Sequence, residues 1–267
     1  MKRALVIGIN DYGPNNSLAG CLNDVNDWAK VFKIREFDEI NIIIDKQATG
    51  NAILSAVDRL IGLSKKGDTL VIQYSGHGSF IRDENNDEDD SVDECLCPYD
   101  IMDNGPIVDD QIYELSQQIK PGVRALMISD SCHSGTVAKF APIMTPPSTK
   151  NVNSPQRTIR FMPPSNFLSK KEISKLSDNK KYSPISRGGY LLLMAGCQDW
   201  EYSYDAYFNG RPNGAFSFVA IESLSKISTK ATYIQWINAI RKMLPSRQYP
   251  QTPNLFGFSN IKRRIIL

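Results

Sequence analysis

The first 130 residues of this chain alternate short apolar runs with longer segments of helical periodicity. β-Branched apolar runs predict strands, and apolar residues spaced three and four apart predict helices. The strands are predicted at 3–9, 39–44, 68–74 and 122–128, and the helices between them at 18–32, 51–63 and 107–119. Thr49 stands where it could cap the second helix. This alternation favours right-handed crossovers, so we expect an α/β fold with a mostly parallel sheet and helices on both faces.

The alternation stops after the fourth predicted strand. Residues 140–187 are rich in Pro, Ser, Asn and Lys and have no periodic apolar face. Such a composition is typical of a mobile insertion or linker. The pattern then resumes with a strand at 190–195, helices at 214–224 and 234–243, and a last strand at 261–267. We therefore expect residues 1–139 and 188–267 to build one sheet, interrupted by the insertion 140–187.

Composition narrows the class of protein. The chain has 267 residues, 41% of them hydrophobic, which is enough for a large core. A net charge of +2 is too small to favour nucleic acid or an anionic membrane as a partner. No apolar run is long enough to cross a bilayer, and the first one ends at Asn10, as expected of a strand rather than a signal peptide. Five cysteines, an odd number, favour free thiols in a reducing compartment such as the cytoplasm.

Reactive side chains follow two of the predicted strands at the points where the strands end. His77 lies between two glycines after strand 68–74, and Cys132 follows strand 122–128. Parallel strands end at the same edge of a sheet, so both side chains are expected in one crevice. A thiol is mostly protonated near pH 7, and an imidazole can take its proton and later protonate a leaving amine.

A lone cysteine at a strand end is often only a core residue, and a lone histidine in a turn often only binds backbone. Together, at one predicted edge, they favour a catalytic dyad. His77 precedes Cys132 by 55 residues, a spacing typical of caspase-type proteases.

Three short motifs resemble those of the metacaspases, which belong to the caspase-like clan of cysteine peptidases. They are Tyr-Ser-Gly-His-Gly at 74–78, Asp-Ser-Cys-His-Ser-Gly at 130–135 and Gly-Cys-Leu-Asn-Asp at 20–24. Weaker similarities follow at 195–198, 213–217 and 251–255, so the resemblance covers nearly the whole chain outside the insertion. It implies a caspase-like fold in a type I-like or single-domain metacaspase. It also implies a cysteine endopeptidase that cuts after Arg or Lys, rather than after Asp, through a thioester acyl-enzyme.

The resemblance implies His77 and Cys132 as the dyad. It places the oxyanion hole at backbone N–H groups, those of Gly78 and Cys132. His133 is similar to the usual neighbour of the nucleophile in this family and is not the base.

The resemblance also implies a pocket for the residue before the cut, formed by Asp24, Ser75 and Asp130. Two carboxylates in one pocket attract a guanidinium or ammonium group and repel an aspartate. The expected partners are therefore proteins or peptides with a basic residue before the cut. The resemblance favours a monomer.

Many metacaspases need calcium, and the resemblance implies carboxylate ligands for Ca²⁺ at Asp93, Asp109 and Asp110. Lys139 stands about where a fourth family carboxylate would fall. Residues 83–94 hold eight carboxylates and partly follow an EF-hand pattern, but Glu88 replaces the glycine that such a loop requires. Asp109 and Asp110 would also suit a helix N-terminus without any metal.

The insertion carries nine basic residues, at 150, 157, 160, 170, 171, 175, 180, 181 and 187. A protease that cuts after basic residues could process itself there. Two other functions compete: a catalytically silent scaffold with the same fold, and a nucleotide-binding protein. A scaffold needs neither the dyad nor the pocket acids, and no Gly-x-Gly-x-x-Gly fingerprint follows the first strand. We therefore expect the peptidase.

Overall fold

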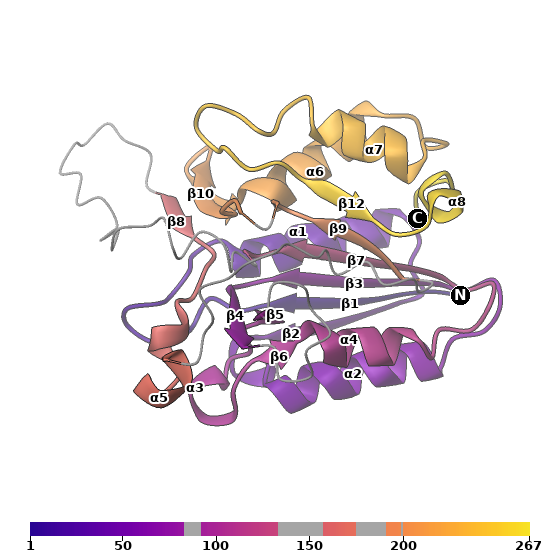
Figure 1. The fold of residues 1–267 in the computed structure, drawn as a ribbon. Coiled ribbons are helices and arrows are strands. Elements are labelled where there is room, and N and C mark those ends of the chain that lie inside the picture. Colours follow the sequence, from indigo (N-terminus) through magenta and orange to yellow (C-terminus); the bar gives the residue numbers. More distant parts are fainter. Residues whose placement is uncertain (83–91, 133–156, 175–190, 199) are drawn as a thin grey trace.

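A computed structural model describes residues 1–82, 92–132, 157–174, 191–198 and 200–267 (Figure 1). Its centre is a six-stranded sheet in the order β12-β9-β7-β3-β1-β2. These strands are β1 (Lys2–Gly8), β2 (Glu39–Ile44), β3 (Thr69–Ser75), β7 (Arg124–Asp130), β9 (Leu191–Ala195) and β12 (Asn254–Phe256). All neighbours are parallel except β12, which pairs antiparallel with β9. The expected α/β architecture is confirmed.

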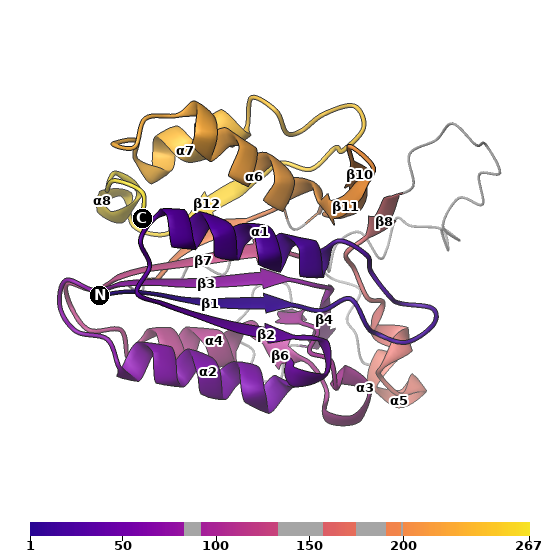
Figure 2. The same ribbon diagram turned by 180° about the vertical axis from the view of Figure 1, so that it is seen from behind.

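Helices cover both faces of the sheet (Figures 1 and 2). On one face lie α1 (Cys21–Ile34), α6 (Ala215–Lys226) and α7 (Tyr233–Ile240), and on the other lie α2 (Gly50–Gly62) and α4 (Asp109–Ser116). Side chains alternate between the faces of a strand. Ala4 and Val6 of β1 accordingly join the core cluster that contains Trp28 of α1, whereas Leu5 and Ile7 join the one that contains Val57 of α2.

A local signal in the sequence located the start of α2 to within one residue. The hydroxyl of Thr49 accepts a hydrogen bond from the N–H of Ala52, so Thr49 caps α2 as expected. The helix expected at 107–119 is shorter, because Ile107–Val108 form β6 and α4 begins at Asp109.

The last strand, expected at 261–267, is wrong. Residues Ser259–Lys262 form α8, and the edge strand of the sheet is β12. The apolar end of the chain is buried in another way: the N–H of Ile266 donates to the carbonyl of Ala231, and Ile266 and Leu267 pack into the core. Burial alone therefore explains this apolar run.

Two small sheets lie where the parallel strands end, at the left in Figure 1. One contains β4 (Gly78–Arg82), β5 (Val92–Leu96) and β6 (Ile107–Val108), and the other contains β8 (Arg157–Ile159), β10 (Tyr204–Phe208) and β11 (Arg211–Gly214). Short helices complete the fold: η1 (Asp45–Gln47), α3 (Ile101–Asn104), η3 (Pro164–Asn166), α5 (Lys170–Ile173) and α8 (Ser259–Lys262).

Residues 157–174 differ from the mobile insertion expected over 140–187. They include β8, η3 and α5, and the side chains of Arg160 and Met162 have no exposed surface. The remainder of the insertion lies outside the described residues. The composition did not reveal this packing, because the stretch is held by contacts with distant parts of the chain rather than by a periodic apolar face.

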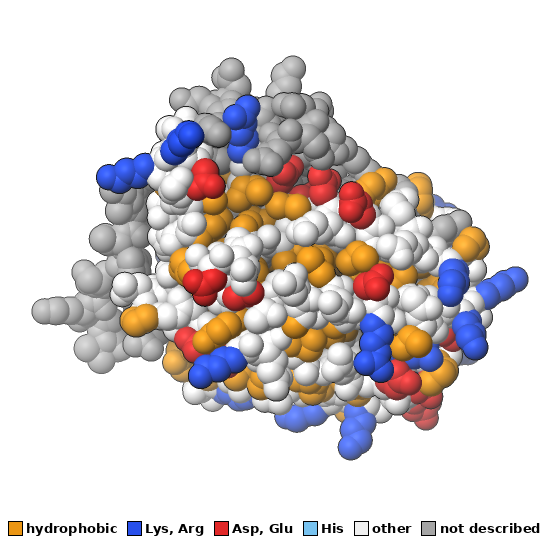
Figure 3. Space-filling model, turned by 90° about the horizontal axis from the view of Figure 1, so that it is seen from below, with side chains coloured by type: hydrophobic (Ala, Val, Ile, Leu, Met, Phe, Trp, Pro, Cys, Tyr) orange, Lys and Arg blue, Asp and Glu red, His pale blue; other side chains and the backbone are white. Residues whose placement is uncertain are grey.

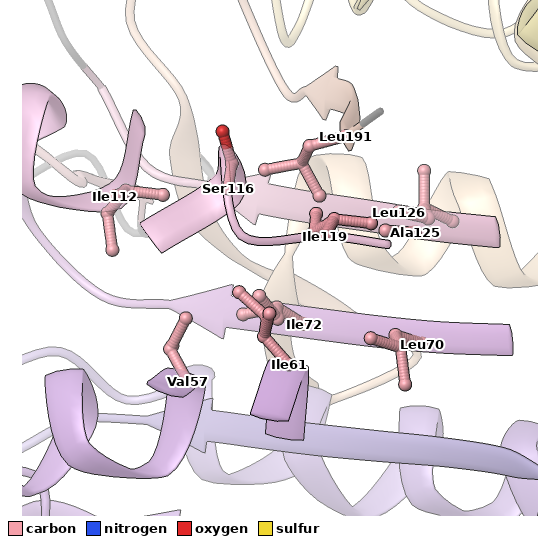
Figure 4. Close-up of a pocket in the computed structure, with 10 residues that line it drawn as sticks. All are labelled: Val57, Ile61, Leu70, Ile72, Ile112, Ser116, Ile119, Ala125, Leu126 and Leu191. Atoms are coloured by element: carbon pink, nitrogen blue, oxygen red, sulfur yellow. The ribbon is translucent and has the colours of Figure 1, made fainter. Parts of the chain in front are cut away.

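The lower face of the sheet is closely packed. Val57 and Ile61 of α2 and Ile112 of α4 point toward Leu70 and Ile72 of β3 (Figure 4). The cavity between them measures about 10 Å³, room for about one water molecule at most. On the outside of this face, hydrophobic side chains reach the surface in separate patches between charged ones (Figure 3). Within the described residues, no helix has the length and hydrophobicity needed to cross a membrane.

Candidate active site

His77 lies in a tight turn between β3 and β4, where both flanking glycines are required by close contacts. A Cβ at Gly76 would lie 2.6 Å from the hydroxyl oxygens of Tyr12 and Tyr74. A Cβ at Gly78 would lie 1.9 Å from the carbonyl oxygen of Cys132. Any side chain at these positions would therefore displace the backbone on either side of His77.

The imidazole of His77 is oriented by a backbone carbonyl. Its Nε2 lies 2.7 Å from the carbonyl oxygen of Asn16, which can only accept, so Nε2 carries the proton in the neutral ring. Nδ1 is then the basic nitrogen; it is buried and has no hydrogen-bond partner among the described residues. Burial, reinforced by the nearby guanidinium of Arg160, lowers the pKa of His77 to about 4. The ring is neutral near pH 7 and can accept a proton at Nδ1.

Cys132 lies two residues beyond the end of β7 and is fully buried. Ser75 at the end of β3 pairs with Asp130 at the end of β7, and His77 and Cys132 each lie two residues beyond this pair. The fold thus brings the proposed dyad to one edge of the sheet. The sulfur of Cys132 also contacts the backbone of Ser203, whose N–H lies 2.7 Å away.

The two N–H groups expected to form an oxyanion hole converge on one oxygen atom. The N–H of Gly78 donates to the carbonyl oxygen of Arg160 at 3.0 Å, and the N–H of Cys132 donates to the same oxygen at 3.1 Å. A carbonyl held by two backbone donors beside a thiol is placed like the carbonyl of a substrate in acyl transfer.

The side chain of the same residue, Arg160, enters a buried pocket lined by three carboxylates. Its guanidinium nitrogens lie 2.7 Å from Asp24, 3.1 Å from Asp130 and 2.9 Å from Asp205. The side chains of Arg160, Asp24 and Asp130 have no exposed surface. Charge-assisted hydrogen bonds of this kind are among the strongest in proteins.

Donors from several elements fix the three carboxylates. Asp24 accepts from the N–H of Gly214 at 3.0 Å, Asp130 accepts from the hydroxyl of Ser203 at 2.6 Å, and Asp205 accepts from the N–H groups of Ala19 and Gly20. Burial, together with the nearby carboxylate of Asp130, raises the pKa of Asp24 to about 6 against the opposing effect of Arg160. Three carboxyl groups therefore surround a single guanidinium in this pocket.

Of the three expected pocket residues, Ser75 is related to the pocket only through its neighbour Asp130. It is buried beside Asp130 in the strand pairing, and its hydroxyl accepts a hydrogen bond from Gln73 at 2.8 Å.

No motif in the sequence indicates Asp205 as a pocket residue. Its only signal was an acidic residue inside an otherwise mostly apolar run at 204–208. The carbonyl of Asn16 was missed as well, because backbone groups have no sequence signature.

The carboxylates expected to bind calcium are only partly gathered. Asp93 is buried on β5, and Asp109 begins α4 next to β6; both lie near enough to Cys95 to raise the pKa of its buried thiol further. Among the described residues, no group of three or more His, Cys, Asp or Glu side chains could hold a metal ion. Ca²⁺ takes six to eight oxygen ligands. The carboxylates of Asp93, Asp109 and Asp110 would therefore form only part of a calcium site. The EF-hand-like stretch 83–91, Lys139 and His133 lie outside the described residues.

Comparison with known proteins gives the family. A family model described as metacaspase, peptidase C14 domain, matches residues 2–141. Metacaspase-1 of Meyerozyma guilliermondii is 29% identical over an alignment of 290 residues, and the alignment covers 95% of this chain and 68% of that protein. Metacaspase-1 of Mycosarcoma maydis is 30% identical over 284 residues, covering 95% and 69%. The chain thus spans about two thirds of the length of these relatives.

Solved structures agree with this. A crystal structure of a Geobacter sulfurreducens protein matches with a TM-score of 0.73 and 29% identity, covering 99% of this chain and 97% of that one. Caspase-1 of Spodoptera frugiperda matches with a TM-score of 0.60 over 96% of this chain and 85% of that one; at 12% identity this supports the fold alone. The chain therefore belongs to the metacaspase family and is a cysteine peptidase of the C14 type.

Proposed function

We propose that this peptidase is an endopeptidase that cuts protein and peptide chains after Arg or Lys. One observation carries the proposal: Arg160 lies with its guanidinium among three buried carboxylates and its carbonyl oxygen on the N–H groups of Gly78 and Cys132. A basic side chain is thus held in the position that aligns its own carbonyl with the thiol. An aspartate in the same pocket would meet repulsion from all three carboxylates.

Cys132 would act as the nucleophile and His77 as its acid–base partner. Nδ1 of His77 takes the thiol proton, and the sulfur attacks the carbonyl carbon of the basic residue. The two N–H donors stabilise the oxyanion. His77 then protonates the leaving amine, the C–N bond breaks, and water hydrolyses the thioester to restore the thiol.

The pocket would favour both basic residues but not equally. The planar guanidinium of arginine can reach several carboxylates at once, whereas the ammonium of lysine is a single point of charge on a flexible stem. We therefore expect cleavage after both, with arginine preferred. Asp24 and Asp130 supply the attraction together with Asp205, and Ser75 lies beside Asp130 in the pairing of β3 with β7.

Calcium stimulation is a second part of the proposal. The oxygen ligands would come from Asp93 on β5 and from Asp109 and Asp110 at the start of α4. The strand β5 follows the His77 turn and β4 in the chain, so these ligands would lie on elements connected to the site. No chemical step above passes through the ion, so its effect would be to order the segment around the site. Excess chelator should then reduce turnover, and Asp93→Asn should weaken the response to added calcium.

Peptide amides that end in Arg, Lys or Asp test the main proposal. We expect release of the leaving amine after Arg and Lys, none after Asp, and none at all by Cys132→Ala or His77→Ala. Cleavage after Asp but not Arg would overturn the pocket assignment, and unchanged turnover by Cys132→Ala would overturn the nucleophile. Full activity in excess chelator would remove calcium without affecting either.

A further inference from the structure

The segment around Arg160 is bound to the rest of the fold as an added strand. β8 pairs antiparallel with β10, with Ile159 opposite Tyr204 and Arg157 opposite Ala206. The N–H of Arg160 continues this pairing and donates to the carbonyl of Ser203 at 2.9 Å. Addition of a strand to a sheet edge is a common way in which proteins bind extended peptides.

The side chains of Arg157 and Ile159, on one face of this strand, contact the rest of the fold. Ile159 is half-buried and packs against the core cluster that contains Tyr204. The guanidinium of Arg157 lies 5.0 Å from the centre of the Tyr204 ring and donates to the carbonyl of Gln248. Thr158, between them, points to solvent.

The residues after Arg160 are bound as well. The ring of Phe161 lies 6.1 Å from Phe80 and 6.2 Å from Tyr202, measured between ring centres. Met162 is fully buried, and its N–H donates to the carbonyl of Gly78 at 2.9 Å. The chain is therefore held on both sides of the bond between Arg160 and Phe161.

We propose that residues 157–162 lie in the substrate groove as a substrate, and that the Arg160–Phe161 bond is the first one this peptidase cuts in its own chain. This rests on the proposed function above. The thiolate of Cys132 attacks the carbonyl carbon of Arg160, the C–N bond to Phe161 breaks, and the new α-amine of Phe161 takes a proton from His77. Water then releases Arg160 with a free carboxylate and returns the thiol.

Other basic residues of the insertion that the structure describes are placed differently. Lys170 and Lys171 lie on α5 with exposed side chains, and Arg157 is exposed at the far end of β8. Arg160 has the buried carboxylates and the two N–H donors. The groove also implies a preference in other substrates: an apolar residue before the basic one and an aromatic or apolar residue after the cut.

The test follows self-cleavage of the full chain by intact mass and N-terminal sequencing. We expect fragments 1–160 and 161–267 from the wild type, the same fragments from Arg160→Lys, and no cut at this bond in Arg160→Gln. Lys171→Gln, which changes an exposed basic residue of the same insertion, serves as the matched control and should behave like the wild type. A first cut at any other basic residue, or an intact wild-type chain that still cleaves Arg peptide amides, would overturn the inference.

Two further measurements separate failure of this inference from other failures. A synthetic peptide of residues 155–166, added to wild-type protein, should be cut after its Arg160. The cut should be at least about tenfold slower when Ile159 is replaced by Asp, because a charge would then be placed against apolar side chains. This does not depend on the folding of Arg160→Gln. Equal rates for the two peptides, or a cut elsewhere in them, would contradict the groove assignment. Absence of turnover of every Arg and Lys peptide amide would instead overturn the proposed function.

Discussion

At the scale of single residues, Asp205 is the pocket carboxylate that no motif indicated. It lies 2.9 Å from the guanidinium of Arg160 and is fixed by the N–H groups of Ala19 and Gly20. In the proposed function, its position on β10 would link recognition of the basic side chain to the strand that pairs with β8. Asp24 and Asp130, by contrast, were predictable because each stands inside a family motif.

Asp205→Asn should weaken binding of the basic side chain. Loss of one charge-assisted hydrogen bond costs about 2 kcal/mol, so kcat/KM for an Arg peptide amide should fall roughly 30-fold, mainly through KM. Alkylation of Cys132 by iodoacetamide should change little, because the thiol and His77 are not altered. Asp58→Asn on the exposed face of α2 is the matched control. An unchanged KM in Asp205→Asn would remove Asp205 from the pocket.

His77 should make stability depend on pH. Its folded pKa of about 4 lies below the ordinary histidine value of 6.5, so between these pH values the unfolded chain takes up a proton that the folded chain does not. The stabilisation is therefore fully present above pH 6.5 and falls by up to about 3 kcal/mol as pH drops to 4.

Urea unfolding of Cys132→Ala, with and without His77→Gln, measures this contribution. The difference in unfolding free energy between the two proteins should shrink as pH falls from 6.5 to 4. Asp24, whose pKa is raised to about 6 and which acts in the opposite direction, is common to both proteins and cancels. A difference that does not change with pH would show that the imidazole is not buried in its neutral form.

At the scale of elements, β10 joins the two halves of the site. It pairs with β11 on one side and β8 on the other, and Ser203 just before it contacts both Cys132 and Arg160. The sequence predicts a mobile insertion where β8 lies, because three residues in a polar stretch have no periodic pattern. Their order comes from the pairing with β10.

The kcat/KM of a peptide substrate should therefore rise when the peptide has residues that can pair with β10. An acetylated Arg-Thr-Ile-Arg amide should have a kcat/KM roughly 100-fold above that of acetyl-Arg amide, since about three backbone hydrogen bonds each contribute about 1 kcal/mol. Replacing Thr by Ser in this peptide is the control, because Thr158 is exposed and should not affect the rate. Equal kcat/KM for the long and short amides would argue against strand addition.

At the scale of the whole molecule, the proposed cut falls between two parts of one sheet. β7 precedes Arg160 and β9 follows it. These strands are parallel neighbours, with Ala125 opposite Leu191 at one end of the pairing and Ser129 opposite Ala195 at the other. Trp28 of α1 lies before the proposed cut in the sequence and Trp236 of α7 after it, and their ring centres are 6.2 Å apart. The two fragments share one core.

After cleavage, fragments 1–160 and 161–267 should remain associated. We expect the processed wild type to elute from a size-exclusion column at the volume of uncut Cys132→Ala, and the fragments to separate only in denaturant. Each fragment alone would expose the apolar face that the other covers, which opposes release. Elution of the smaller fragment by itself under native conditions would contradict this.

Much of this protein follows from its sequence alone. Apolar periodicity is a local property, so the strands β1, β2, β3 and β7 and the helices between them could be located, together with the sheet edge at which His77 and Cys132 end. The family motifs added the roles that we propose for Asp24 and Asp130.

The tertiary structure decided which groups meet at that edge. Asp205 is distant in sequence from Asp24, the orientation of His77 depends on a carbonyl, and Arg160 is one of nine basic residues in its segment. No local pattern distinguishes these groups, because each owes its role to partners that only the folded chain brings within hydrogen-bonding distance.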